Sequence, residues 1–334
     1  MPRHRRLEIP SAVYHVIARG LERREIFKDN ADREEFLRRL AESLNNNGSK
    51  CYGWVLMPNH FHLLIRSGAN PLSTLMRKVL TGYAIYFNRK YKRHGYLYQN
   101  RYKSVLCHEE TYLLELVRYI HLNPLRAGIV KDMDALNKFP WSGHAVILGT
   151  HRAPFQTTGE ILERFGTGTV AARNKYLAFI SDGMKMGKRD DLSGGGLRRS
   201  AGGWQGVHAL KRAKEYWRGD ERVLGDGEFV NHVLKISDEK MARKEQFKKD
   251  GWDIKRLVKR VCEVMGVREE EIIKRGHNNT ISAARALVAY WGYRELGISG
   301  TEIANYFCIT RPSVSTAIKR GEYIAKQKGV YLIN

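Results

Sequence analysis

The order of strand-like and helix-like patterns in the first 122 residues restricts the fold more than any other feature of the chain. Pro58-Asn59 separates two strand-like runs and therefore predicts a hairpin. The predicted elements are a strand at 12–18, a helix at 31–44, strands at 51–57 and 60–65, a helix at 71–91, a strand at 101–107 and a helix at 109–122. This order predicts an α+β fold, a ferredoxin-like antiparallel sheet with helices packed on one face.

The chain of 334 residues is long enough for two or three domains. We expect a first domain over 1–150, a helical connector over 151–250, and an all-α helix-turn-helix domain over 251–334. The glycine-rich run 193–203 is the best candidate for a linker inside the connector.

The charge balance indicates a polyanionic partner. Lys and Arg number 58 against 35 Asp and Glu, which gives a net charge of +23. Neutralised phosphates release counterions, so a surplus of this size favours nucleic acid. There is no apolar run long enough to cross a membrane, so a membrane partner is not expected. The basic start lacks the apolar core of a signal peptide, and the four cysteines are scattered, as in a cytoplasmic protein.

The segment MPNHFHLLI, residues 57–65, contains a histidine pair. Alternation along a strand places His60 and His62 on one face, about 6–7 Å apart. Both imidazoles can then reach one cation. A pair of this kind is often not a metal site, and it needs further ligands to become one.

Those further groups occur in residues 110–128. On a helix, Tyr119 and Asn123 lie one turn apart, next to the apolar stripe that includes Leu116 and Ile120. An amide oxygen could complete a metal site while the phenol faces whatever the metal binds. With 17 tyrosines in the chain, a packing role for Tyr119 is the alternative. His121 is expected at the surface or beside the metal ligands.

Four segments together resemble the REP-associated tyrosine transposases, relatives of the single-tyrosine HUH transposases. They are YHVIARG near the start, MPNHFHLLI, GYLYQNRYKS at 95–104 and VRYIHLNPLRAGIV at 117–130. The resemblance implies that His60 and His62 bind the metal and that Tyr119 is the nucleophile. It implies that Asn123 stands where related enzymes carry a glutamine ligand; its side chain is one methylene shorter.

The resemblance also implies cleavage and rejoining of single-stranded DNA that carries a hairpin, through a 5′-phosphotyrosine, by a monomer or homodimer. Oxygen ligands favour Mg²⁺ or Mn²⁺, whereas the two imidazoles would also accept Zn²⁺. Two alternatives stay open. The protein could be a non-catalytic regulator that binds DNA repeats, or a metal-dependent nuclease that uses water.

Basic and aromatic residues alternate in 77–103, a combination that suits single-stranded nucleic acid. The basic residues expected to contact DNA are Arg77, Lys78, Arg89, Lys90, Arg101 and Lys103.

Residues 299–325 predict a helix-turn-helix that binds duplex DNA. Ser299 and Glu302 suggest a capping box, and Pro312 falls in the first turn of the second helix. The alternative is a plain helical hairpin. The stretch is similar to the duplex-binding domain of the replication initiator DnaA, although that family's Asp-His-Thr run is replaced here by Pro-Ser-Val. The expected DNA contacts are Arg311, Ser313, Ser315 and Lys319.

Overall fold

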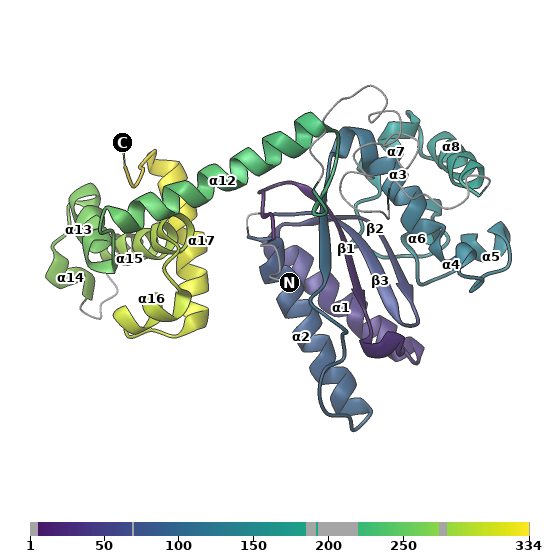
Figure 1. Cartoon of the computed structure of the whole chain (residues 1–334), viewed down its shortest axis with the longest axis horizontal. Helices are drawn as coiled ribbons and strands as arrows, with labels where there is room; N and C mark the ends of the chain where they lie inside the picture. Colours follow the sequence, from purple (N-terminus) through teal and green to yellow (C-terminus); the bar gives the residue numbers. More distant parts are fainter. Residues whose placement is uncertain (1–5, 69, 185–191, 193–219, 274–278, 334) are drawn as a thin grey trace. The chain divides into compact units, whose positions relative to one another are not determined.

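The computed structural model (Figure 1) describes residues 6–68, 70–184, 192, 220–273 and 279–333. The chain divides into two compact units, Met1–Ser237 and Asp238–Asn334. The segment 193–203, expected as a linker, lies outside the described residues. The expected division of the chain into three functional parts stays a prediction.

The first unit is built on one five-stranded sheet in the order β2-β3-β1-β4-β5. The strands are β1 (Val13–Arg19), β2 (Lys50–Met57), β3 (His60–Arg66), β4 (Lys103–Cys107) and β5 (Val223–Leu224). The first four pair antiparallel, whereas β5 runs parallel to β4. The predicted α+β class and the ferredoxin-like arrangement of these four strands are confirmed, and β5 is an addition at the edge.

Two long helices, α1 (Asn30–Asn47) and α2 (Leu72–Lys90), cover one face of the sheet. The N-cap of α1 is Asp29, whose side chain accepts a hydrogen bond from the main-chain nitrogen of Asp32, and its C-cap is Gly48 in the left-handed conformation. Their apolar stripes meet alternate strand residues such as Phe61 in one buried core. This follows the helical and strand periodicities of the sequence.

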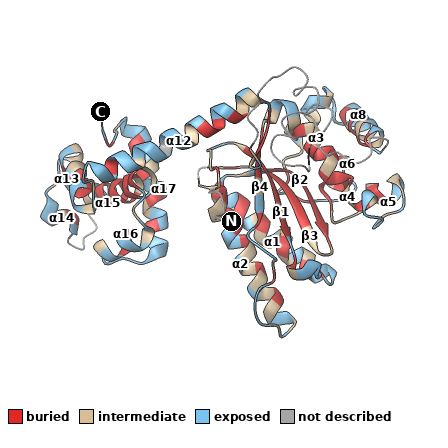
Figure 2. Cartoon of the chain, viewed as in Figure 1, coloured by how far each residue is buried: buried red, intermediate tan, exposed pale blue. Residues whose placement is uncertain are grey.

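Helices also cover the opposite face, so the expectation of helices on one face only is wrong. Helix α3 (Glu109–His121) packs there with α6 (Gly143–Leu148) and α8 (Thr169–Asp182), around a second core that includes Leu64. The physical reason is that β2 is buried at every position after Lys50 (Figure 2). A strand of this kind needs apolar cover on both sides.

Short helical segments connect these elements. They are η1 (Leu21–Arg23), α4 (Asn123–Arg126), α5 (Met133–Asn137), α7 (Gly159–Leu162) and η2 (Glu163–Phe165). In η1, Glu22 and Arg23 both have positive φ angles, 52° and 62°. Non-glycine residues adopt this conformation at a cost of about 1–2 kcal/mol each.

The segment from 220 to 237 belongs to the first unit, although the residues just before it lie outside the described ranges. Strand β5 pairs with the edge of β4, and the first turns of α12 (Gly227–Lys249) bury Val230 and Val233 in the core between the sheet and α1–α2. The ring of Phe229 stacks on His108, the residue directly before α3, at a centroid distance of 4.5 Å.

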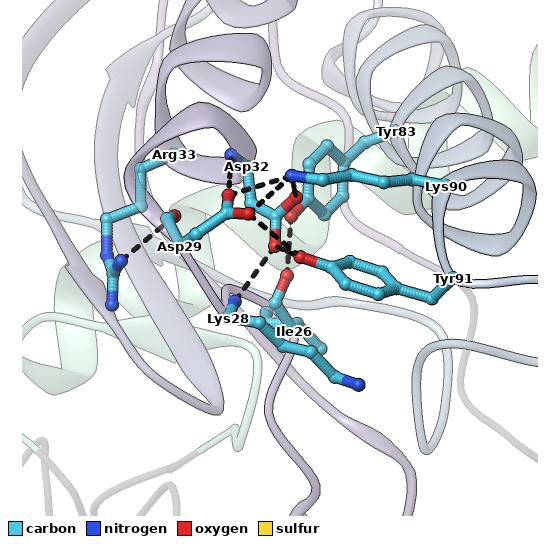
Figure 3. A network of polar contacts seen from close by, with 8 residues as sticks. All are labelled: Ile26, Lys28, Asp29, Asp32, Arg33, Tyr83, Lys90 and Tyr91. Carbon is cyan, nitrogen blue, oxygen red and sulfur yellow. Dashed lines mark hydrogen bonds and ion pairs between the residues drawn. The ribbon is translucent and has the colours of Figure 1, made fainter.

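A polar network fastens the loop before α1 to the end of α2 (Figure 3). The Lys90 ammonium forms ion pairs with both Asp29 and Asp32, whose carboxylate oxygens lie 2.7 and 2.8 Å away. Asp32 is fully buried, and it also accepts hydrogen bonds from the main chain of Lys28 and the hydroxyl of Tyr91. A buried carboxylate is tolerated because each oxygen has a partner.

The second unit is helical. Its elements, besides the end of α12, are α13 (Ile254–Met265), α14 (Glu269–Ile273), α15 (Asn279–Trp291), η3 (Gly292–Leu296), α16 (Gly300–Tyr306) and α17 (Arg311–Lys328). Ser299 caps α16 and Thr310 caps α17. The expected pair of helices at the end of the chain is confirmed. Within the described ranges, no helix is long and apolar enough to cross a membrane.

Candidate active site

The two histidines of β3 lie on the face of the sheet that α3 covers. Phe61 packs in the opposite core, so alternation turns His60 and His62 toward α3. Their ring centroids are 5.2 Å apart. The structure therefore confirms that the pair shares one face. Across the strand pairing, His60 is opposite Arg19 and His62 is opposite Ile17.

A third histidine, which the sequence analysis missed, lies beside this pair. Nε2 of His15 on β1 is 2.9 Å from Nδ1 of His62, and both side chains are buried. The two rings stack with a centroid distance of 5.1 Å. Because Nδ1 of His62 makes this contact, Nε2 is the nitrogen of the His62 ring that can bind a further group.

Helix α3 brings Tyr119 to these histidines. The phenol ring lies edge-on, 6.0 Å between centroids, to both His15 and His62. Burial raises the pKa of Tyr119 above its usual value of 10, and the positive charges of Arg126 and Arg19 oppose this shift. The guanidinium of Arg126 lies 5.7 Å from the centre of the Tyr119 ring.

Asn123 follows α3 at the first position of α4, before Pro124. Its Nδ2 donates to the main-chain oxygen of Tyr119 at 2.8 Å. This bond uses the donor end of the amide, so Oδ1 is the end that could reach a metal ion. Asn123 is thus fixed to the residue that carries the phenol, in agreement with the predicted spacing.

The chemical state of the histidines fits a metal site. Burial, with a smaller contribution from Arg19, lowers the pKa of His60 to about 4. Burial, with His15 and His60, holds the pKa of His62 well below its usual value. Both rings are therefore neutral near pH 7 and keep a lone pair, as metal ligands must. Among the described residues, no set of three or more His, Cys, Asp or Glu side chains is placed to hold a metal ion.

The predicted DNA contacts in 77–103 do not all lie near Tyr119. Arg77, Lys78 and Arg89 are exposed on α2, which covers the sheet face opposite to His62. Lys90 belongs to the ion-pair network of Figure 3. Arg101 precedes β4 and is exposed.

Lys103 lies on the same face as the histidines. Lys103 pairs with Ile17 in the β1–β4 register. Leu106, three residues later on the same strand, points into the core beneath α1 and α2, so the side chain of Lys103 points to the opposite face. Together with Arg19 and Arg126, it places positive charge around the Tyr119 face. Arg19 and Arg126 were also missed from the sequence, although Arg19 belongs to the alternating run YHVIARG that contains His15.

In the second unit, the four predicted contact residues share one helix. Arg311, Ser313, Ser315 and Lys319 are exposed on α17, whereas Val314 and Ile318 are buried. Gly321 lets α17 cross α15 closely, because a Cβ there would lie 2.0 Å from the main-chain oxygen of Ala286. The exposed side of α17 is therefore the side that carries the predicted residues.

Of the two positions expected for His121, the surface is wrong, because the side chain is buried. Its Nδ1 lies 2.8 Å from the hydroxyl of Tyr176 on α8, and the same hydroxyl lies 2.9 Å from Nδ1 of His144 on α6. The ring of His121 is fully buried. It joins the Tyr119 helix to the outer helices.

Residues 8–123 match the family model described as transposase, IS200-like. No curated protein matches the chain. A solved structure of a REP-associated tyrosine transposase bound to a REP hairpin is 17% identical with a TM-score of 0.38, and the match covers 45% of this chain and 86% of that one.

Proposed function

We propose that this enzyme cleaves and rejoins single-stranded DNA with Tyr119 as the nucleophile, because residues 8–123 match the model of the IS200-like transposases. The observation that supports this proposal is that three separate elements bring their side chains together: the ring of Tyr119 on α3 lies beside the rings of His62 on β3 and His15 on β1. Asn123 and the positive charges of Arg126 and Arg19 lie beside the same phenol.

The proposed reaction begins when the phenol oxygen of Tyr119 attacks the phosphorus of a scissile phosphodiester. The bond to the 3′ oxygen breaks, which gives a 5′-phosphotyrosine and a free 3′-hydroxyl. Rejoining is the reverse attack by a 3′-hydroxyl, so the phosphodiester energy is conserved and no nucleotide cofactor is consumed.

The charges around Tyr119 suit this step. The pKa of the phenol is raised by burial, so loss of its proton needs compensation. Arg126 and Arg19 already favour the phenolate and would also attract the phosphate. His60, His62 and Asn123 would hold Mg²⁺ or Mn²⁺, which would polarise the phosphate oxygens.

The two units would bind different forms of DNA. The first unit would hold a strand with a hairpin, because Tyr119 must reach an unpaired phosphate. The exposed side of α17 in the second unit would bind duplex DNA in the major groove. That the second unit is similar to the duplex-binding domain of DnaA is part of the same proposal.

The test is covalent capture of DNA by the wild-type protein and by Tyr119→Phe. We expect the wild type to form an adduct with a labelled hairpin-bearing strand in Mn²⁺. Tyr119→Phe should form none and should bind the strand within a few-fold of wild type, because only one hydroxyl is lost. Tyr112→Phe, on the first turns of the same helix, is the matched control and should keep the adduct.

The outcomes separate the three candidate functions. Cleavage without an adduct would indicate a nuclease that uses water. Binding without cleavage would indicate a regulator of DNA repeats. An adduct that persists in Tyr119→Phe would show that another tyrosine is the nucleophile.

A further inference from the structure

Asn59 lies in the turn between β2 and β3, directly before His60, and its amide bridges two parts of the site. Nδ2 donates to the main-chain oxygen of Arg23 at 3.0 Å, and Oδ1 lies 2.7 Å from Nδ1 of His60. We infer that Asn59 is a positioning residue that holds His60 in the tautomer protonated at Nδ1. This inference rests on the proposed function, in which the opposite nitrogen, Nε2, binds a divalent metal ion.

The orientation of the Asn59 amide follows from its partner. The main-chain oxygen of Arg23 can only accept a hydrogen bond, so the NH₂ end of the amide must face it. The oxygen end then faces His60, and because it too can only accept, Nδ1 of His60 must carry the hydrogen. A neutral imidazole protonated at Nδ1 presents its lone pair at Nε2. Metal-binding histidines are commonly oriented through their second nitrogen in this way.

The carbonyl of Arg23 is presented by a tight turn. Glu22 and Arg23 are both left-handed, and the turn closes through the main-chain nitrogen of Arg23 and the oxygen of Gly20, 3.1 Å apart. A Cβ at position 20 would lie 2.1 Å from the main-chain oxygen of Arg24, so only glycine fits there. The nitrogen of Gly20 also donates to the main-chain oxygen of Asn59 at 2.8 Å. The turn thus holds both the main chain and the side chain of Asn59.

The rest of the loop is braced against the same hairpin. The main-chain nitrogens of Ile26 and Phe27 both donate to the oxygen of Pro58, at 2.8 and 3.1 Å. One residue further on, the Asp32 carboxylate holds Lys28, as Figure 3 shows. Non-glycine residues keep left-handed conformations only where the surrounding structure fixes them. The bracing therefore explains how the Arg23 carbonyl stays in place to orient Asn59.

The geometry decides the tautomer at His60 but not at His62. The partner of His62 is His15, and an imidazole nitrogen can donate or accept. An amide oxygen has no such choice. Asn59 is therefore the residue on which the inference can be tested.

The first measurement needs no metal. In ¹⁵N-labelled, metal-free, full-length protein, two-bond ¹H–¹⁵N correlations report which nitrogen of His60 carries the proton. We expect the Nδ1–H pattern in wild type and in Asn59→Asp, which keeps the acceptor oxygen. Asn59→Ala should move His60 toward the Nε2–H pattern. Asn45→Ala, at an exposed position of α1, is the matched control and should leave the spectrum of His60 unchanged.

The second measurement is Mn²⁺ titration of the same proteins, followed by electron paramagnetic resonance. Loss of a residue that orients a metal ligand typically weakens metal binding by about 10–100-fold. We expect Asn59→Ala to raise the Kd for Mn²⁺ at least about 10-fold, while Asn45→Ala leaves it unchanged. Circular dichroism should show that all variants are folded.

The outcomes are distinct. A wild-type His60 protonated at Nε2 would overturn the inference without any variant, even if Asn59→Ala fails to fold. An Asn59→Ala protein with the wild-type tautomer and the wild-type Kd would overturn it as well. If the wild type binds no Mn²⁺, the proposed metal site is wrong, and the spectrum of His60 still decides the role of Asn59.

Discussion

The phenol of Tyr176 connects the helix that carries Tyr119 to two outer helices, and removing its hydroxyl tests how much this connection stabilises the unit. The hydroxyl lies 2.8 Å from Nδ1 of His121 and 2.9 Å from Nδ1 of His144. Nε2 of His144 lies 2.9 Å from Oδ1 of Asn137. Since that oxygen accepts, His144 carries its proton at Nε2 and accepts from the hydroxyl of Tyr176 at Nδ1. The hydroxyl oxygen then accepts from Nδ1–H of His121.

Tyr176→Phe removes both hydrogen bonds and leaves two buried imidazole nitrogens without a partner. Among the residues that the structure describes, Nε2 of His121 has no hydrogen-bond partner, so a change of tautomer would not give this ring a new hydrogen bond. Each buried unpaired group costs about 1–3 kcal/mol, and for two groups we expect the free energy of unfolding of the first unit to fall by about 2–6 kcal/mol. For a unit of this size, that lowers Tm by roughly 5–20 °C.

The assay is thermal unfolding of the full chain, combined with hydrogen exchange measured by mass spectrometry. Faster exchange should appear in the peptides of α3, α6 and α8. Tyr96→Phe is the control, because Tyr96 is 85% exposed; its Tm should change by less than about 2 °C. If Tyr176→Phe keeps the wild-type Tm and exchange, the two histidines have other partners and the reasoning about the network fails.

Three further predictions concern His144, the segment that contains β5, and the exposed side of α17. Burial lowers the pKa of His144 from 6.5 to about 4, so between pH 6.5 and 5 the unfolded chain takes up a proton at His144 and the folded chain does not. Lowering the pH over this range should therefore destabilise the wild type more than His144→Gln, by about 1.4 kcal/mol per pH unit, as measured by urea titration. A fragment 1–193 lacks β5 and the buried Val230 and Val233, so its Tm should lie below that of 1–237; equal values would contradict a structural role for β5. Arg311→Ala should weaken duplex binding and lower the salt slope by about 1, whereas Lys326→Ala, whose ammonium is paired with Glu322, should change neither.

Local patterns determined much of the first unit. The alternation of apolar residues assigned Phe61 and Leu63 to one core and turned His60 and His62 to the other face, because strand side chains alternate in any context. The spacing of Tyr119 and Asn123 followed from helical periodicity in the same way. The N-cap at Ser299 could also be predicted from the sequence, because the Ser299 side chain accepts a hydrogen bond from the main-chain nitrogen of Glu302, only three residues away.

Tertiary structure alone decided the contacts between distant segments. Strand β5 is two residues long and carries no periodic signal; it exists because the edge of β4 offers hydrogen bonds to it. His15 meets His62 only because β1 pairs with β3 in one particular register, across 47 residues of sequence. The turn at Arg23 likewise depends on the hairpin that it holds. Such contacts depend on how separate elements pack, and no local pattern in the sequence encodes that packing.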